Sequence, residues 1–238
     1  LMKNQSGLLS GEFGIVRGLS NYKDNNSKST YLGAIRYRTP DMKHWIDYEV
    51  ITGDAQADPN KINGSSSALA ADTANFPVNR IVSSSSQKRI EQHLTFISEF
   101  APQWKGVIEF TYGEQKGDAS NTTFFATGAP FSGAKYGGIE GQLQYKIDTK
   151  LAVAGRLETF RDRDGFALFP NTATGVNSAV GGDFNEATIG LQWRPAKHLL
   201  VRPELRFDWQ SHNNGVNAFA GGTKDKQQLF AVDLVYQY

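Results

Sequence analysis

The sequence lacks several features that define common classes of protein. Its 238 residues include no cysteine, which excludes disulfide scaffolds, thiolate metal sites and cysteine nucleophiles. Its 25 Lys and Arg nearly balance its 24 Asp and Glu, so electrostatics give no reason to expect nucleic-acid binding. No apolar run approaches the roughly 18 residues of a membrane-spanning helix. A soluble protein would fit these absences, but a transmembrane β-barrel is also polar on average.

The sequence is rich in aromatic residues and glycine, and its apolar and polar residues alternate strictly over many segments. It contains 15 Phe, 9 Tyr, 4 Trp and 24 Gly, a mixture that favours strands over helices. In residues 198–209, every second residue from Leu199 to Trp209 is apolar, and the residues between them include charges of both signs. The same period of two recurs in 29–39, 44–52, 89–101, 105–115, 135–146, 150–162, 186–194 and the C-terminal segment. With a less regular stretch at 12–19, the pattern predicts about ten amphipathic strands.

Short turns alternate with long polar loops along the whole chain. The short turns lie at 39–43, 101–105, 147–150 and 194–197. The long loops, rich in Gly, Ser, Asn and Asp, lie near 20–29, 54–86, 116–133, 163–184 and 211–225. We interpret 54–86 as a long loop and not as an interdomain linker, because hairpins of the same design resume on both sides. The chain is thus predicted to be a single domain, 1–238, with one hairpin as its repeating unit.

Ten amphipathic strands could form a soluble barrel or sandwich, or an outer-membrane β-barrel whose apolar face meets lipid. Strands of about 10 to 13 residues are long for a soluble sheet and suit tilted membrane strands. Tight turns at one end and long loops at the other are typical of outer-membrane barrels. The aromatics near the turns suit an interfacial girdle; they are Tyr37, Trp45, Trp104, Tyr145, Trp193, Tyr236 and Tyr238. We therefore predict an all-β, antiparallel transmembrane barrel in the bacterial outer membrane.

This architecture implies an orientation and a set of partners. The short turns and both termini are expected in the periplasm and the long loops outside the cell. The alternating C-terminal strand ending in Tyr238 resembles the signal read by barrel-assembly machinery. The other expected partners are outer-membrane lipid and lipopolysaccharide, small hydrophilic solutes, and a second copy or another outer-membrane protein. Nucleic acid is not expected.

Several stretches, most of them in the second half of the chain, resemble the OmpL-like β-barrel porins of Gram-negative bacteria. They are GIVRG at 14–18, TYLG at 30–33, RLETFRDRDG at 156–165, ATIGLQWRP at 187–195, LVRPELRFD at 200–208 and KQQLFAVD at 226–233. The resemblance implies an outer-membrane barrel with a passive pore, and it implies no particular substrate. Members of that family look longer than this chain, so it is either a short member or part of a larger barrel of roughly 12 to 18 strands whose N-terminal strands lie outside it.

The polar face of the strands carries the candidate functional residues. The expected pore-lining residues are Arg36, Glu49, Glu140, Gln142, Arg156, Glu158, Gln192, Arg194, Arg202, Glu204, Arg206 and Asp208. Cross-strand Arg–carboxylate pairs are expected between each of the strands that carry Arg156 and Arg206 and their common neighbour, which carries Gln192 and Arg194. Such a wall could favour small hydrophilic solutes, or its paired charges could plug a narrow barrel. Mixed charges predict weak ion selectivity at most.

Two other functions fit the same pattern. A barrel could serve as a scaffold or receptor that binds a partner through its long loops. It could also be an omptin-like rim protease, in which Asp208, Asp162, Asp164 and His212 activate water. A solvated loop histidine is the simpler interpretation of His212. No metal-binding, phosphate-binding or nucleophile motif is present, so we expect no cofactor, no metal and no catalytic residue.

Overall fold

The computed structural model describes residues 2–4, 7–17, 28–54, 81–83, 88–117, 122–124, 129–130, 132–168 and 180–236. All regular structure in these ranges is β-strand. The described ranges contain no helix long and apolar enough to cross a membrane.

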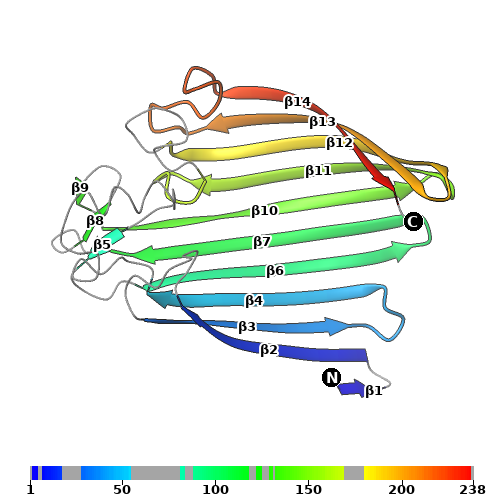
Figure 1. Cartoon of the computed structure of the whole chain (residues 1–238), viewed down its shortest axis with the longest axis horizontal. Coiled ribbons are helices and arrows are strands. Elements are labelled where there is room, and N and C mark those ends of the chain that lie inside the picture. Colours follow the sequence, from blue (N-terminus) through cyan, green and yellow to red (C-terminus); the bar gives the residue numbers. More distant parts are fainter. Residues whose placement is uncertain are drawn as a thin grey trace.

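One large antiparallel sheet dominates the structure (Figure 1). Its strands are β1 (Met2–Asn4), β2 (Gly7–Arg17), β3 (Ser29–Arg38), β4 (His44–Asp54), β6 (Lys88–Ala101), β7 (Trp104–Lys116), β10 (Gly133–Lys146), β11 (Leu151–Asp162), β12 (Gly182–Ala196), β13 (Leu199–Ser211) and β14 (Lys226–Tyr236). They pair in this order. The prediction of an antiparallel all-β fold is confirmed, and the irregular first strand begins earlier than the expected 12–19.

The tight turns all lie at one end of the sheet and the long connections at the other (Figure 1). The C-terminal end of β14 and the short strand β1 both lie at the tight-turn end, as the alternation of short and long connections requires. Among the described residues, β14 pairs only with β13 and β1 only with β2. The described sheet therefore has two free edges.

Two of the long loops pair with each other in a second, small sheet, which the sequence did not predict. Its strands are β5 (Ile81–Ser83), β8 (Thr122–Phe124) and β9 (Ala129–Pro130), in the order β5-β8-β9. The segments that contribute β5 and β8 belong to the expected loops 54–86 and 116–133. Most of the predicted 54–86 loop lies outside the described residues.

Cross-strand register assigns every residue of the large sheet to one of two faces. Leu157 lies opposite Ala187, and Ala187 lies opposite Phe207. The face that they share, which we call the apolar face, carries large side chains that remain exposed. They include Phe13, Ile15, Tyr31, Ile35, Ile46, Phe96, Ile108, Phe110, Ile139, Leu143, Leu157, Ile189, Leu205, Phe207, Phe230, Val232 and Leu234. So large an exposed apolar surface is rare in soluble monomers and is what a lipid-facing sheet requires.

The turn between β3 and β4 shows how the tight connections form. Pro40 fixes the φ angle at the first central position of a turn, closed by a 2.9 Å hydrogen bond from the Met42 amide to the Thr39 carbonyl. The Asp41 carboxylate accepts hydrogen bonds from the Thr39 hydroxyl, at 2.6 Å, and from the Lys43 amide, at 3.1 Å. Met42 then takes a positive φ of 60° to bring the chain back into β4.

The Asp41 turn should contribute to stability only while its carboxyl is ionised. The Thr39 hydroxyl and the Lys43 amide lower the pKa of the Asp41 carboxyl below its usual value. A lowered pKa stabilises the folded state above the ordinary aspartate pKa of about 3.9, and the contribution is lost as pH falls through the lowered value. We expect Asp41→Asn to lower the urea midpoint of detergent-folded protein at neutral pH. The difference from the unmutated chain should shrink as the pH falls below the ordinary aspartate pKa and the carboxyl becomes protonated; a difference that stays constant as the carboxyl is protonated would contradict this account.

The exposed apolar face predicts different responses to charge on the two sides of one strand. Leu157 lies on the apolar face with 67 % of its surface exposed, and Ala154 of the same strand lies on the opposite face. Leu157→Arg should destabilise the protein in phospholipid bilayers by about 2 to 4 kcal/mol. Ala154→Arg is the matched control and should have a much smaller effect. Unfolding in bilayers, followed by tryptophan fluorescence, measures both, and equal effects would contradict a lipid-facing role for Leu157.

Candidate functional site: the charged face of the sheet

The face opposite the apolar face, which we call the polar face, carries eleven of the twelve expected pore-lining residues; the twelfth, Arg194, lies within the register irregularity at the end of β12. The register of β10 to β14 aligns their side chains, and β3 and β4 continue the same face. One hollow of about 400 Å³ on this face is lined by several of them: Gln142, Arg156, Gln192, Arg202 and Glu204. The structure therefore brings together residues that are up to 62 positions apart in the sequence.

A three-way ion-pair cluster lies on β2, β3 and β4. Arg36 contacts Glu12 and Asp47, each at 2.6 Å, and Glu49 at 2.7 Å. Three carboxylates around one guanidinium leave the cluster with an excess of negative charge. Of its carboxylates, only Glu49 was expected at the pore; Asp47 could have been found, because it alternates with Glu49 in the same strand.

A second cluster is centred on Glu186 of β12, whose side chain is 5 % exposed. Its carboxylate accepts a hydrogen bond from Arg156 of β11, at 2.7 Å from Nε, and lies 2.9 Å from Arg206 of β13. The Thr188 hydroxyl donates to it at 2.7 Å. Arg206 also contacts Asp208 at 2.7 Å. Glu186 therefore joins three adjacent strands.

Arg156 and Arg206 both pair with β12, the common neighbour on which pairs were expected. The carboxylate that receives them, Glu186, was not among the expected pore-lining residues, and Gln192 and Arg194 of the same strand lie nearer its tight-turn end. Arg202 pairs with Asp233 of β14 instead. The position of Glu186, two residues before Thr188 in the alternating pattern, was the available signal.

The register also creates a row of carboxylates that no single strand reveals. Glu109, Glu140, Glu158, Glu186 and Asp208 lie directly opposite one another on β7, β10, β11, β12 and β13. We call this set the carboxylate row. Like charges opposite each other in a sheet destabilise it. Arg156 and Arg206 offset this repulsion only at the end of the row formed by Glu186 and Asp208. At the other end, Glu140 accepts from Gln142, and Glu109 accepts from Thr95 at 3.3 Å.

The segment after β11 folds over the polar face at the long-loop end. The buried Asp162 carboxylate accepts hydrogen bonds from the backbone amides of Phe166, Ala167 and Leu168, at 2.7 to 2.9 Å. These bonds hold the Phe166 ring, 1 % exposed, at 4.8 Å from the Arg89 guanidinium and 5.8 Å from the Tyr136 ring. Arg89 and Tyr136 both lie on the polar face. The segment that carries Phe166 therefore covers part of that face and narrows the space beside it.

The arrangement that a rim protease would need is not formed. His212 Nδ1 lies 3.1 Å from Asp183, and Asp208 pairs with Arg206 and with Gln227. Asp162 is occupied by backbone amides. Among the described residues, no group of three or more His, Asp or Glu is arranged to hold a metal ion.

The expected aromatic girdle lies on the apolar face at the tight-turn end, with one exception. The rings of Trp104 and Tyr145 are 4.6 Å apart, and their strands place Tyr37, Trp193 and Tyr236 on the same face. Trp45 is the exception, because it shares its face with Asp47, and the Arg38 guanidinium lies 4.0 Å from its ring. Tyr238 lies outside the described residues.

Removal of the negative charge of Glu186 tests whether this residue holds the wall together. Glu186→Gln would remove the ion-pair partner of Arg156 and leave Arg206 with Asp208 alone, and breaking such a pair costs up to about 3 to 5 kcal/mol when it is buried. We expect a loss of about 2 kcal/mol, since the arginines are partly exposed to water. Glu204→Gln, an exposed residue of the same face, is the control and should change little. Equal urea midpoints for the two variants would contradict the role of Glu186.

Comparison with known proteins finds two similar solved structures and one family. A solved structure titled "CymD monoaromatic hydrocarbon channel" has a TM-score of 0.43 and 10 % identity, with 98 % of this chain and 69 % of that chain covered. Another, titled "NanC porin structure in rhombohedral crystal form", has a TM-score of 0.40 and 8 % identity, with 98 % and 99 % covered. No curated protein matches the sequence. Residues 4–238 match the family described as "Putative beta-barrel porin-2, OmpL-like", and the chain therefore belongs to this family of porins.

Proposed function

We propose that small hydrophilic solutes and ions diffuse passively along the polar face, through a pore in the bacterial outer membrane. The observation that supports this most strongly is the separation of the two faces of one continuous sheet. Exposed aliphatic and aromatic side chains cover one face, and ion-paired arginines and carboxylates cover the other. Membership in a porin family favours a pore over a scaffold or receptor barrel.

The same proposal includes closure of the sheet and its orientation. A free sheet edge in hydrocarbon leaves backbone groups without hydrogen-bond partners, at a cost of several kcal/mol each. We therefore infer that the edges of β14 and β1–β2 are paired within the membrane. The tight turns and both ends of the chain would lie in the periplasm and the long loops outside, as in other outer-membrane barrels. The strand number of the closed barrel sets its width, which conductance and solute-exclusion measurements report.

The charges of the polar face suggest a modest preference for cations. The carboxylate row crosses five adjacent strands, and only two of its members contact an arginine. Rows of Asp and Glu favour cations in pores. The nearby arginines offset part of this effect, so the preference should remain weak.

Planar-bilayer recordings test the pore and its preference together. The triple variant Glu109→Gln, Glu140→Gln and Glu158→Gln should lower the cation-to-anion permeability ratio by a factor of about two to three, because charges act over about 10 Å at 0.1 M salt. The control removes three carboxylates from the tight-turn end, by Asp41→Asn, Glu99→Gln and Asp148→Asn, and should leave the ratio nearly unchanged.

The two outcomes that contradict these proposals are distinct. If the folded, unmutated chain carries no current, the porin function is wrong. If it carries current and the triple variant keeps the same permeability ratio, the carboxylate row does not face the conducting path.

A further inference from the structure

A cluster of cationic side chains at the long-loop end has no role in the proposed pore. Asp183 of β12 is surrounded by Arg161, Arg163 and His212, at 3.4, 3.1 and 3.1 Å. Arg163 makes two parallel hydrogen bonds to it. The side chains of the two arginines and the histidine are 53 to 70 % exposed, whereas that of Asp183 is 12 % exposed. One carboxylate thus holds two arginines and a histidine in place and leaves net positive charge toward solvent.

This cluster lies on the apolar side of the sheet. Arg161, Asp183 and Ser211 lie opposite one another on β11, β12 and β13. The next row toward the middle of the apolar face contains Thr159, Asn185 and Trp209, and the row after it is apolar, with Leu157, Ala187 and Phe207. The order of cationic, polar and apolar rows matches the order of headgroup, interface and hydrocarbon in a membrane.

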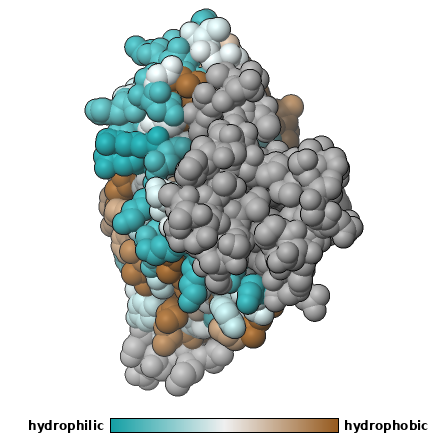
Figure 2. All heavy atoms as spheres, turned by 90° about the vertical axis from the view of Figure 1, so that its left-hand side faces the viewer, coloured by the Kyte–Doolittle hydropathy of each residue, from teal (hydrophilic) through white to brown (hydrophobic). Residues whose placement is uncertain are grey.

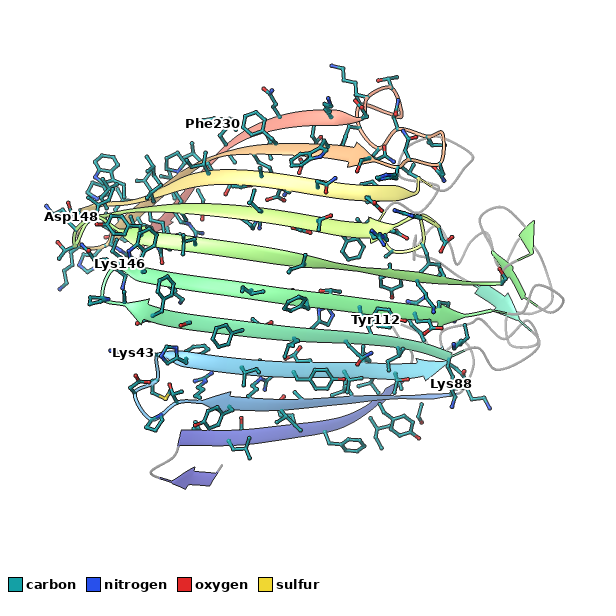
Figure 3. The ribbon with its side chains drawn as sticks, turned by 180° about the vertical axis from the view of Figure 1, so that it is seen from behind. Lys43, Lys88, Tyr112, Lys146, Asp148 and Phe230 are labelled. Atoms are coloured by element: carbon teal, nitrogen blue, oxygen red, sulfur yellow. The ribbon has the colours of Figure 1, made fainter. Side chains whose placement is uncertain are left out.

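Further cations continue the same rim on either side. Lys226 lies opposite Trp209, and Lys135 lies opposite Glu114, which itself pairs with Lys116. Lys88 occupies the long-loop end of β6, and Tyr112 lies near the same end of β7 (Figure 3). Carboxylates also face this rim, namely Asp183, Glu114 and Asp54, but cations outnumber them. Hydrophilic residues gather in the upper part of this end, over the ends of β12 to β14 (Figure 2).

Gly137 of β10 lies between Arg161 on one side and Tyr112 on the other. The backbone of Thr111 fills the place of a Cβ at Gly137, so the groups of this rim that can bind a phosphate are the exposed guanidinium groups themselves. Guanidinium groups bind phosphate oxygens in pairs.

We propose that this rim, centred on Arg161 and Arg163, binds the phosphate groups of a phosphorylated glycolipid of the outer leaflet, whose acyl chains lie along the apolar face. The proposal rests on the proposed orientation, in which the long loops lie outside the cell. The tight-turn end also carries cations, such as Lys43 and Lys150, but none of its described carboxylates holds two arginines as Asp183 does.

Binding of purified lipid A to the folded chain in detergent tests the proposal. The probes are bis-phosphorylated lipid A and the same lipid after removal of its phosphates, with inorganic phosphate as a competitor. The unmutated chain should bind the phosphorylated form more tightly. Arg161→Ala with Arg163→Ala should weaken this binding by roughly ten- to thirtyfold, since each cation near a lipid surface contributes about fivefold. Lys43→Ala with Lys150→Ala, at the tight-turn end, is the matched control and should bind as the unmutated chain does.

A second variant distinguishes the loss of rim cations from misfolding around Asp183. Lys135→Ala with Lys226→Ala removes two rim cations that do not contact Asp183 and should weaken binding in the same direction, by a smaller factor. Equal affinity for the two forms of lipid A, or equal loss in rim and tight-turn variants, would overturn the proposal. Displacement of the lipid by inorganic phosphate would show a free-phosphate site instead and would also overturn it.

Bilayer conductance separates this proposal from the porin function. The arginine variant should conduct ions as the unmutated chain does, because its residues lie on the apolar side. Loss of lipid binding with normal current supports the rim site. Absence of current from the unmutated chain, with lipid binding intact, would contradict only the porin function.

Discussion

Each residue of the long strands faces one side of the sheet only, and a shift of one residue in the pairing of any strand would reverse its faces. In β13, such a shift would move Arg202, Arg206 and Asp208 among exposed apolar side chains, at a cost of several kcal/mol per charge in hydrocarbon. The tight turns prevent the shift, because the hydrogen bonds of the Thr39 and Asp41 turn leave one way to pair β3 with β4. Register is therefore the constraint on which both faces depend.

The polar face must then accommodate the charges that register brings together. Glu158, Glu186 and Asp208 lie directly opposite one another, a repulsive arrangement that would be unstable alone. Arg156 lies two residues before Glu158 in β11, and Arg206 lies two residues before Asp208 in β13. Both arginines pair with Glu186. The mixed charges on each strand thus have a structural reason, since the arginines next to the carboxylate row neutralise part of its charge. The stability of the sheet and the charge of its polar face therefore have the same origin.

Local pattern predicted the faces, and it could not predict the partners. The alternation from Leu199 to Trp209 assigns each side chain to a face because a period of two needs no knowledge of neighbours. Trp45 was misassigned because its closeness to a turn was given more weight than its position relative to Asp47. Glu186 as the common partner of Arg156 and Arg206, the carboxylate row, and the pairing of β5 with β8 all depend on how separate segments align. Single strands carry no information on that alignment.

The two faces can change almost independently, because they use alternate residues of the same strands. Leu157 lies on the apolar face, and its neighbours in sequence, Arg156 and Glu158, lie on the polar face. The exception is the long-loop end, where both sides meet. There Asp162 holds the segment of Phe166 over the polar face, while Arg161, the preceding residue, joins the cationic rim on the other side. Adjacent residues of one strand thus hold a loop segment on one side of the sheet and a cationic cluster on the other, so a change in the path of the chain at this point would alter both.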